Sequence, residues 1–90
     1  MKNIINEEFF SLDMGEEKKE YEICEIIAQI KIKRRILELG FVNSNVKILK
    51  KSAKNGVFLL EIRGYVLALK RKEVACIFVK KGAKNNGNYN

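Results

Sequence analysis

The chain has 90 residues, of which 47% are hydrophobic and 9% aromatic, and it carries a formal net charge of +7. A chain of this length forms one small domain with a single core. The sequence contains no histidine, so the commonest general base and the commonest transition-metal ligand are both missing. It also lacks the glycine-rich patterns that cradle the phosphates of nucleotides. These features argue against an enzyme.

Charge is distributed unevenly along the chain. Residues 1–30 hold three lysines and eight acidic residues, a balance of −5, whereas residues 31–90 have a balance of +12. The basic residues are scattered without interleaved aromatic residues, so nucleic-acid binding is not expected. No apolar run approaches the roughly 20 residues of a membrane-spanning helix, and the first eight residues lack the apolar segment of a signal peptide. We expect a cytoplasmic protein.

One domain is expected over residues 1–81, with residues 1–8 loosely attached to it. Residues 11–15 contain serine, aspartate and glycine, which favour turns. Residues 16–20 have no apolar periodicity and predict an exposed acidic loop. Residues 82–90 are rich in asparagine and glycine and predict a disordered tail.

The first strand is expected over residues 21–27, which are rich in β-favouring residues. Strict alternation along a strand would place Tyr21, Ile23 and Ile27 on one side of it. The same alternation would place Ile26 on the opposite side.

Residues 33–41 predict a short basic helix that is ended by a glycine. Ile32, Ile36 and Leu39 are spaced so that they share one helical face, which Leu37 widens and which we expect to pack on the core. Gly40 stands where a helix C-terminus favours a residue that adopts a positive φ, and the following phenylalanine can fold back onto the last turn.

Four basic residues, Lys31, Lys33, Arg34 and Arg35, fall in the first turns of this helix. The helix dipole favours acidic residues there, so the arrangement costs a few tenths of a kcal/mol. Two interpretations remain open: the basic turn binds an acidic partner surface, or it is an ordinary solvated face.

Four further strands are expected, at residues 46–51, 57–62, 66–69 and 76–79. The Asn55-Gly56 pair predicts a tight hairpin between the first two of them. Residues 70–75 predict a single helical or 3₁₀ turn before the last strand. The whole pattern predicts a mainly β fold, a small closed barrel with one inserted short α-helix and a 3₁₀ turn before the last strand.

Candidate metal ligands are few. Cys24 and Cys76 are far apart in the sequence and in no metal-binding spacing. The usual role of such residues is that of small apolar side chains in or beside strands. The carboxylates that remain as weak candidates lie in the acidic loop and the first strand, and they are Glu16, Glu17, Glu20, Glu22 and Glu25.

Residues 34–41, Arg-Arg-Ile-Leu-Glu-Leu-Gly-Phe, resemble the helix-to-glycine signature of the ferrous iron transport protein A (FeoA) family. Residues 67–75 with Ile77 and Val79 are similar to the closing segment of that family, and residues 11–15 resemble its opening. The resemblance covers about residues 9 to 80. One departure is the turn Asn43-Ser44-Asn45, where the family usually has Pro-Gly.

The resemblance implies an SH3-like β-barrel with an inserted helix, in a non-catalytic cytoplasmic protein without a resident cofactor. It also implies a partner, the membrane ferrous iron transporter FeoB, bound at its cytosolic GTPase region. We expect a monomer or a weak homo-oligomer. The expected partner-binding residues are those of the helix and the turn after it: Lys33, Arg34, Arg35, Glu38, Leu39, Gly40, Phe41, Val42 and Asn43.

Two other functions remain open. The chain could sense or deliver a transition metal ion through Cys24, Cys76 or the N-terminal glutamates. It could also bind a proline-rich peptide in an SH3-like groove, although the absence of tryptophan and the few aromatic residues argue against this function.

Overall fold

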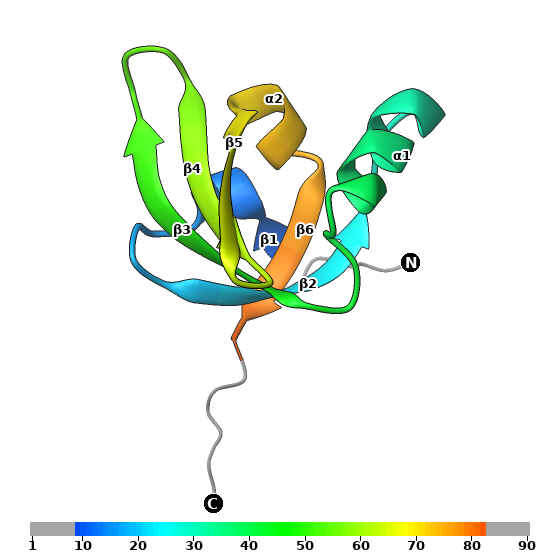
Figure 1. The fold of residues 1–90 in the computed structure, drawn as a ribbon, viewed down its shortest axis with the longest axis horizontal. Helices are drawn as coiled ribbons and strands as arrows, with labels where there is room; N and C mark the ends of the chain where they lie inside the picture. The colour runs from blue at the N-terminus through cyan, green and yellow to red at the C-terminus, as the bar shows by residue number, and fades with distance from the viewer. Residues whose placement is uncertain (1–8, 83–90) are drawn as a thin grey trace, which may run out of the picture.

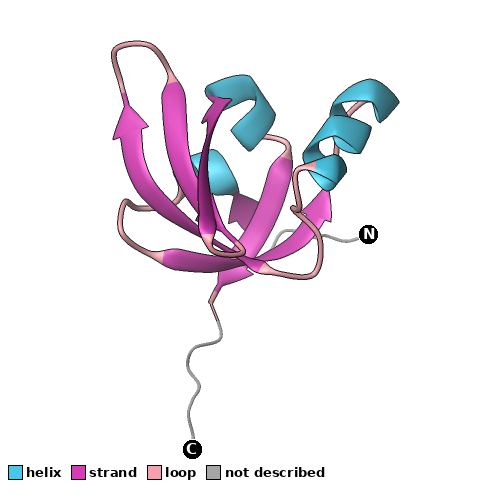
Figure 2. Ribbon diagram, in the orientation of Figure 1, coloured by secondary structure: helices cyan, strands magenta, loops and turns pink. Residues whose placement is uncertain are grey.

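The computed structural model describes residues 9–82. The segment expected to be loose (residues 1–8) and all but the first residue of the expected tail lie outside this part. The described residues form mainly β-structure with short helical pieces (Figure 2). In chain order the elements are β1 (Phe10–Ser11), the 3₁₀ helix η1 (Leu12–Met14), β2 (Glu20–Ile26), α1 (Ile30–Glu38), β3 (Asn45–Ser52), β4 (Val57–Ile62), β5 (Tyr65–Lys70), α2 (Arg71–Val74) and β6 (Ile77–Lys81).

The strands form one antiparallel sheet in the order β1-β6-β2-β3-β4-β5. The sheet curls into an SH3-like barrel, with α1 inserted between β2 and β3 (Figure 1). The mainly β prediction with one inserted helix is confirmed. The expectation of a closed barrel is wrong: β1 and β5 are the edge strands, and within residues 9–82 no pairing joins them. β1 is only two residues long and pairs with β6 alone.

The segment before the last strand, expected as a single helical or 3₁₀ turn, takes the helical form. Residues 71–74 form one turn of α-helix, not a 3₁₀ turn, because the Ala75 N–H reaches back four residues to the Arg71 carbonyl oxygen at 2.8 Å. The Glu73 carboxylate accepts a hydrogen bond from the Lys70 N–H at 3.0 Å and so closes the start of this turn. The 3₁₀ helix lies instead at the opening of the domain, in η1.

A β-bulge interrupts β2 and corrects the expected side-chain pattern. The pairing with β6 shifts between Ile23 and Glu25, and a bulge adds one residue that the partner strand does not match. The alternation therefore changes phase, so that Ile26 is buried and Ile27 is 57% exposed, the reverse of the expectation. The bulge leaves Cys24 exposed.

The hydrophobic core fills the concave side of the curled sheet. Nearly every strand contributes to it, because strands with one buried face alternate apolar and polar residues. Its members are Leu12, Tyr21, Ile23, Ile26, Ile36, Phe41, Val46, Ile48, Phe58, Leu60, Ile62, Leu69, Val74, Ile77 and Val79. Only Ile36 comes from α1, and this helix stands beside the end of β2, apart from the main body of strands (Figure 1).

Candidate partner-binding surface

The N-terminus of α1 is poorly capped, whereas its C-terminus is closed by backbone hydrogen bonds. Gln29 precedes it without a side-chain cap, and its first turn holds no acidic residue. At the other end, Gly40 has a φ of +106°. The Gly40 N–H donates to the Leu37 carbonyl at 3.0 Å and the Phe41 N–H donates to the Ile36 carbonyl at 3.4 Å. This pair of bonds is the Schellman motif, and it places Phe41 in the core. The predicted helix end is confirmed.

The turn after α1 is held by the β4–β5 connection. The Arg63 guanidinium donates to the carbonyl oxygens of Gly40 and Val42, at 3.2 and 2.8 Å. The Tyr65 hydroxyl donates to the Leu39 carbonyl oxygen. The Tyr65 contact satisfies a carbonyl that the helix end leaves without an intrahelical partner, and the Arg63 contacts hold the turn that follows it. We call Arg63 and Tyr65 the latch. The sequence did not single out either residue, because no local pattern around them indicates a contact with a helix more than twenty residues away.

Apolar side chains remain exposed along α1. Ile30 is 66% exposed and Leu37 is 38% exposed, although Ile36 on the adjoining side of the helix is fully buried. A shallow hollow of about 350 Å³ runs along this face between Ile30, Lys33, Arg34, Leu37 and Glu38. The expected stripe is therefore buried only in part, and the exposed apolar residues lie among basic ones.

A second, smaller hollow separates α1 from the bulged end of β2. Its volume is about 100 Å³, and it shares Lys33 and Leu37 with the first hollow. The two hollows thus form one continuous surface. We call it the α1 surface, made of Ile30, Lys33, Arg34, Leu37, Glu38, Cys24, Glu25, Val42 and Asn43.

The structure brings together most of the expected partner-binding residues. Lys33, Arg34, Glu38, Val42 and Asn43 line the α1 surface. The remaining ones take structural positions or a different partner: Phe41 is buried, Leu39 and Gly40 are half-buried at the helix end, and Arg35 is committed elsewhere. Sequence reasoning missed Ile30 and Leu37 as surface residues, because Leu37 was expected to widen the buried stripe and Ile30 to precede the helix, whereas α1 begins at Ile30 and both side chains are exposed.

Arg35 joins α1 to α2. Its guanidinium lies 2.9 Å from the Glu73 carboxylate, and the side chains are 61% and 13% exposed, respectively. Glu73 therefore holds both the start of α2 and the side of α1. This ion pair is one of the few side-chain ties between α1 and the rest of the domain, and it explains one of the four basic residues without a partner protein.

The weak metal candidates do not gather. The Cys24 thiol is exposed on the bulge, and the Cys76 thiol lies 3.3 Å from the Lys72 carbonyl oxygen after α2. Although Cys24 is exposed, partial desolvation by the surrounding protein raises the pKa of its thiol; Lys80 opposes that shift, and the nearby carboxylates of Glu22 and Glu25 add to it. Within residues 9–82, no group of three or more cysteine, aspartate or glutamate residues is placed to hold a metal ion.

Several of the candidate carboxylates have protein partners. The Glu16 carboxylate lies 3.3 Å from the Lys19 ammonium. The Glu17 carboxylate accepts the Lys51 backbone N–H at 2.7 Å. The first contact lies within the acidic loop and the second attaches the loop to β3, so part of the acidic first third of the chain is used within the fold.

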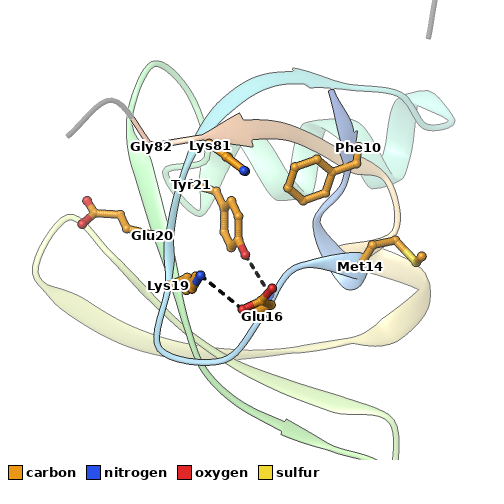
Figure 3. Close-up of a pocket in the computed structure, with 8 residues that line it drawn as sticks. All are labelled: Phe10, Met14, Glu16, Lys19, Glu20, Tyr21, Lys81 and Gly82. Atoms are coloured by element: carbon orange, nitrogen blue, oxygen red, sulfur yellow. Dashed lines mark hydrogen bonds and ion pairs between the residues drawn. The ribbon is translucent and has the colours of Figure 1, made fainter. Parts of the chain in front are cut away.

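A larger hollow of about 700 Å³, which no sequence pattern predicted, lies at the opposite end of β2. Figure 3 shows the Phe10 and Tyr21 rings next to each other in this hollow. They pack edge to face, with 5.4 Å between their centroids. The Tyr21 hydroxyl accepts the Glu16 N–H at 2.8 Å. The Glu16 carboxylate also forms an ion pair with Lys19 in this hollow, and none of the expected partner-binding residues lines it.

Within residues 9–82, no helix is both long and apolar enough to span a membrane. No curated protein matches the sequence. Among solved structures, a FeoA-like protein from Clostridium acetobutylicum is 24% identical with a TM-score of 0.77, covering 92% of this chain and 98% of that one. A FeoA protein from Chlorobium tepidum is 23% identical with a TM-score of 0.75, covering 87% and 75%.

The same fold occurs inside a larger protein. A manganese-dependent transcriptional repressor in complex with manganese is 15% identical with a TM-score of 0.78; the match covers 88% of this chain but only 39% of the repressor. At these identities the structural likeness shows the fold alone. The family model of the FeoA domain matches residues 10–81, which is most of the chain. This chain therefore belongs to the FeoA family.

Proposed function

We propose that this chain is a non-catalytic FeoA protein of the cytoplasm that supports or regulates ferrous iron uptake by binding the cytosolic GTPase region of the transporter FeoB. Family membership supports a role in iron uptake, because a solved FeoA structure with a TM-score of 0.73 is described as an iron uptake regulatory protein. The α1 surface is the binding site in this proposal.

The exposed apolar residues of α1 are the observation that carries the proposal. A helix in a small domain usually buries its apolar face, yet Ile30 and Leu37 remain exposed beside Lys33 and Arg34. A partner with an apolar patch surrounded by carboxylates would cover Ile30 and Leu37 and neutralise Lys33 and Arg34. Neutralisation would also remove the unfavourable interaction of the basic residues with the helix dipole.

A binding measurement with charge-reversed variants tests this proposal. The titration uses the purified cytosolic region of FeoB, and the variant Lys33→Glu/Arg34→Glu changes only the α1 surface. We expect the affinity of this variant for the partner to fall about tenfold or more, because two attractive contacts with partner carboxylates become repulsive. Arg35 is left unchanged because its ion pair with Glu73 belongs to the fold.

The matched control is Lys50→Glu/Lys81→Glu, which changes the same charge at two exposed positions on β3 and β6. This variant should bind as the unchanged protein does. Equal loss in both variants would show that only net charge matters, and binding that survives in the α1 variant would rule out the α1 surface. The absence of binding by the unchanged protein would overturn the proposed partner.

A further inference from the structure

The strand β5 is an edge strand without the usual protection. It pairs with β4 from Tyr65 to Lys70, and within residues 9–82 no strand pairs with its other edge. Edge strands expose backbone N–H and C=O groups, and proteins commonly protect them by shortness, proline or charged side chains. The other edge strand, β1, has two residues, whereas β5 has six, with Lys70 as its only charged residue. The sequence contains no proline.

The side chains of β5 are also open to solvent. Tyr65 and Val66 are 46% and 53% exposed, and Ala68 is exposed as well. Leu69, by contrast, is buried in the core. The strand is therefore fixed by its inner residues while its outer residues remain available for contact.

The surroundings of this edge are basic. A hollow of about 510 Å³ lies along the second half of β5, bordered by α1 and α2. Arg35, Lys70 and Lys72 line it, against one carboxylate, that of Glu73. Glu73 already accepts hydrogen bonds from Arg35 and from the Lys70 backbone. The hollow thus has an excess of positive charge, and 61% of the Arg35 side chain remains exposed.

We propose that β5 accepts an extended acidic segment of a partner protein as an added strand. The backbone of the segment would hydrogen-bond to the free edge of β5, which is a recurring mode of peptide recognition. Acidic side chains of the segment would meet Arg35, Lys70 and Lys72. This site goes beyond the proposed function: it is distinct from the α1 surface and does not depend on it.

A second copy of this chain fits the edge less well. Antiparallel pairing of two β5 strands would bring the end of one, with Lys70 and Arg71, toward the start of the other, with Arg63. Like charges facing each other across strands are destabilising. Charge complementarity therefore favours an acidic segment over a dimer.

A peptide titration of the full-length, ¹⁵N-labelled protein tests the proposal. The probe is a capped eight-residue peptide of alternating threonine and glutamate, which favours extended structure, and its control replaces each glutamate with lysine. We expect the acidic peptide alone to shift the amide signals of residues 65–70 and to slow their hydrogen exchange. An acidic peptide that is N-methylated at every residue keeps its charges but loses its donors, and it should not bind.

Charge variants locate the site. Lys70→Glu/Lys72→Glu should weaken the acidic peptide about tenfold, while Lys50→Glu/Lys81→Glu and Lys33→Glu/Arg34→Glu should not weaken it. Equal binding of the N-methylated peptide, or shifts confined to other strands, would overturn strand addition. Shifts of the same amides on concentrating the protein alone would assign the edge to a second copy and overturn the acidic partner.

Discussion

The strand β4 and the helix α1 are attached to the domain in very different ways. On β4, Phe58, Leu60 and Ile62 are all at most 1% exposed, and the strand is paired on both sides. On α1, one of nine residues is buried, and the helix is held by its glycine end, the latch and one ion pair. The alternation of buried and exposed residues on β4 is explained by folding alone. The exposed apolar residues of α1 are not explained by folding, which is why we propose that this helix binds a partner.

The largest expected effect is in the barrel. Phe58→Ala removes a fully buried ring and should lower the free energy of unfolding by about 3–5 kcal/mol, because it combines lost burial with a cavity. The neighbouring change Leu59→Ala, at a residue that is 38% exposed, should cost less than about 1 kcal/mol. Urea unfolding measures both. Similar losses for the two variants would contradict the assignment of buried and exposed faces on β4.

Gly40→Ala tests the end of α1. Its φ of +106° is strained for any other residue, and an added Cβ would lie 2.9 Å from the Tyr65 hydroxyl of the latch. We expect a loss of about 1–3 kcal/mol and faster amide hydrogen exchange in α1. The comparison is Gly56→Ala in the β3–β4 turn, where φ is +64° and no atom lies within 4 Å, so the loss should be about 1 kcal/mol. A larger loss at Gly56 would contradict the role of the latch.

The ion pair between Arg35 of α1 and Glu73 of α2 should contribute less to stability than Phe58 or Gly40 does. In a double-mutant cycle of Arg35→Gln and Glu73→Gln, we expect a coupling energy of about 0.5–1 kcal/mol, reduced by the exposure of Arg35. Glu73→Gln should cost more than Arg35→Gln, because it also replaces the charged acceptor of the Lys70 N–H with a neutral one. Thermal unfolding of the four proteins measures the cycle. A coupling energy of zero would show that the pair does not hold α1.

The smallest effect concerns the bulge beside α1. Because burial raises the pKa of the Cys24 thiol, less thiolate forms at a given pH, and alkylation should require a higher pH than in the unfolded chain. The rate of iodoacetamide modification against pH, measured in a Cys76→Ala background with and without urea, checks this shift. A lower apparent pKa in the folded protein would place Cys24 in a different environment from the one described.

Local patterns in the sequence predicted the elements that depend on neighbouring residues. The bounds of β4 follow from alternation, and the hairpin before it follows from the turn residues Asn55 and Gly56, although four residues (53–56) instead of two separate the strands and only Gly56 takes a positive φ. The helix end follows from Gly40 and the apolar residue after it. Each of these features is determined within a few residues, so a single sequence suffices.

Features that depend on distant residues were not predictable in this way. The two residues of β1 become a strand only by pairing with Phe78 and Val79. The bulge at Cys24 is set by the pairing of β2 with β6, and it exchanges the environments of Ile26 and Ile27.

The same limit applies to the candidate site. The basic residues and the turn were visible in the sequence, but the ion pair that turns Arg35 away from the α1 surface and toward Glu73 joins residues in two separate helices. The latch likewise joins α1 to the turn between β4 and β5. Only the folded chain shows which basic residues remain available to a partner.

The most direct test of the central claim is a two-dimensional NMR titration of the labelled protein with the purified cytosolic region of FeoB, with and without guanine nucleotide. We predict shifts at residues 30–43 and at the bulge of β2, and little change in β4. Shifts that spare α1 while the partner binds, or no shifts at saturating partner concentration, would contradict the claim that α1 is a binding surface.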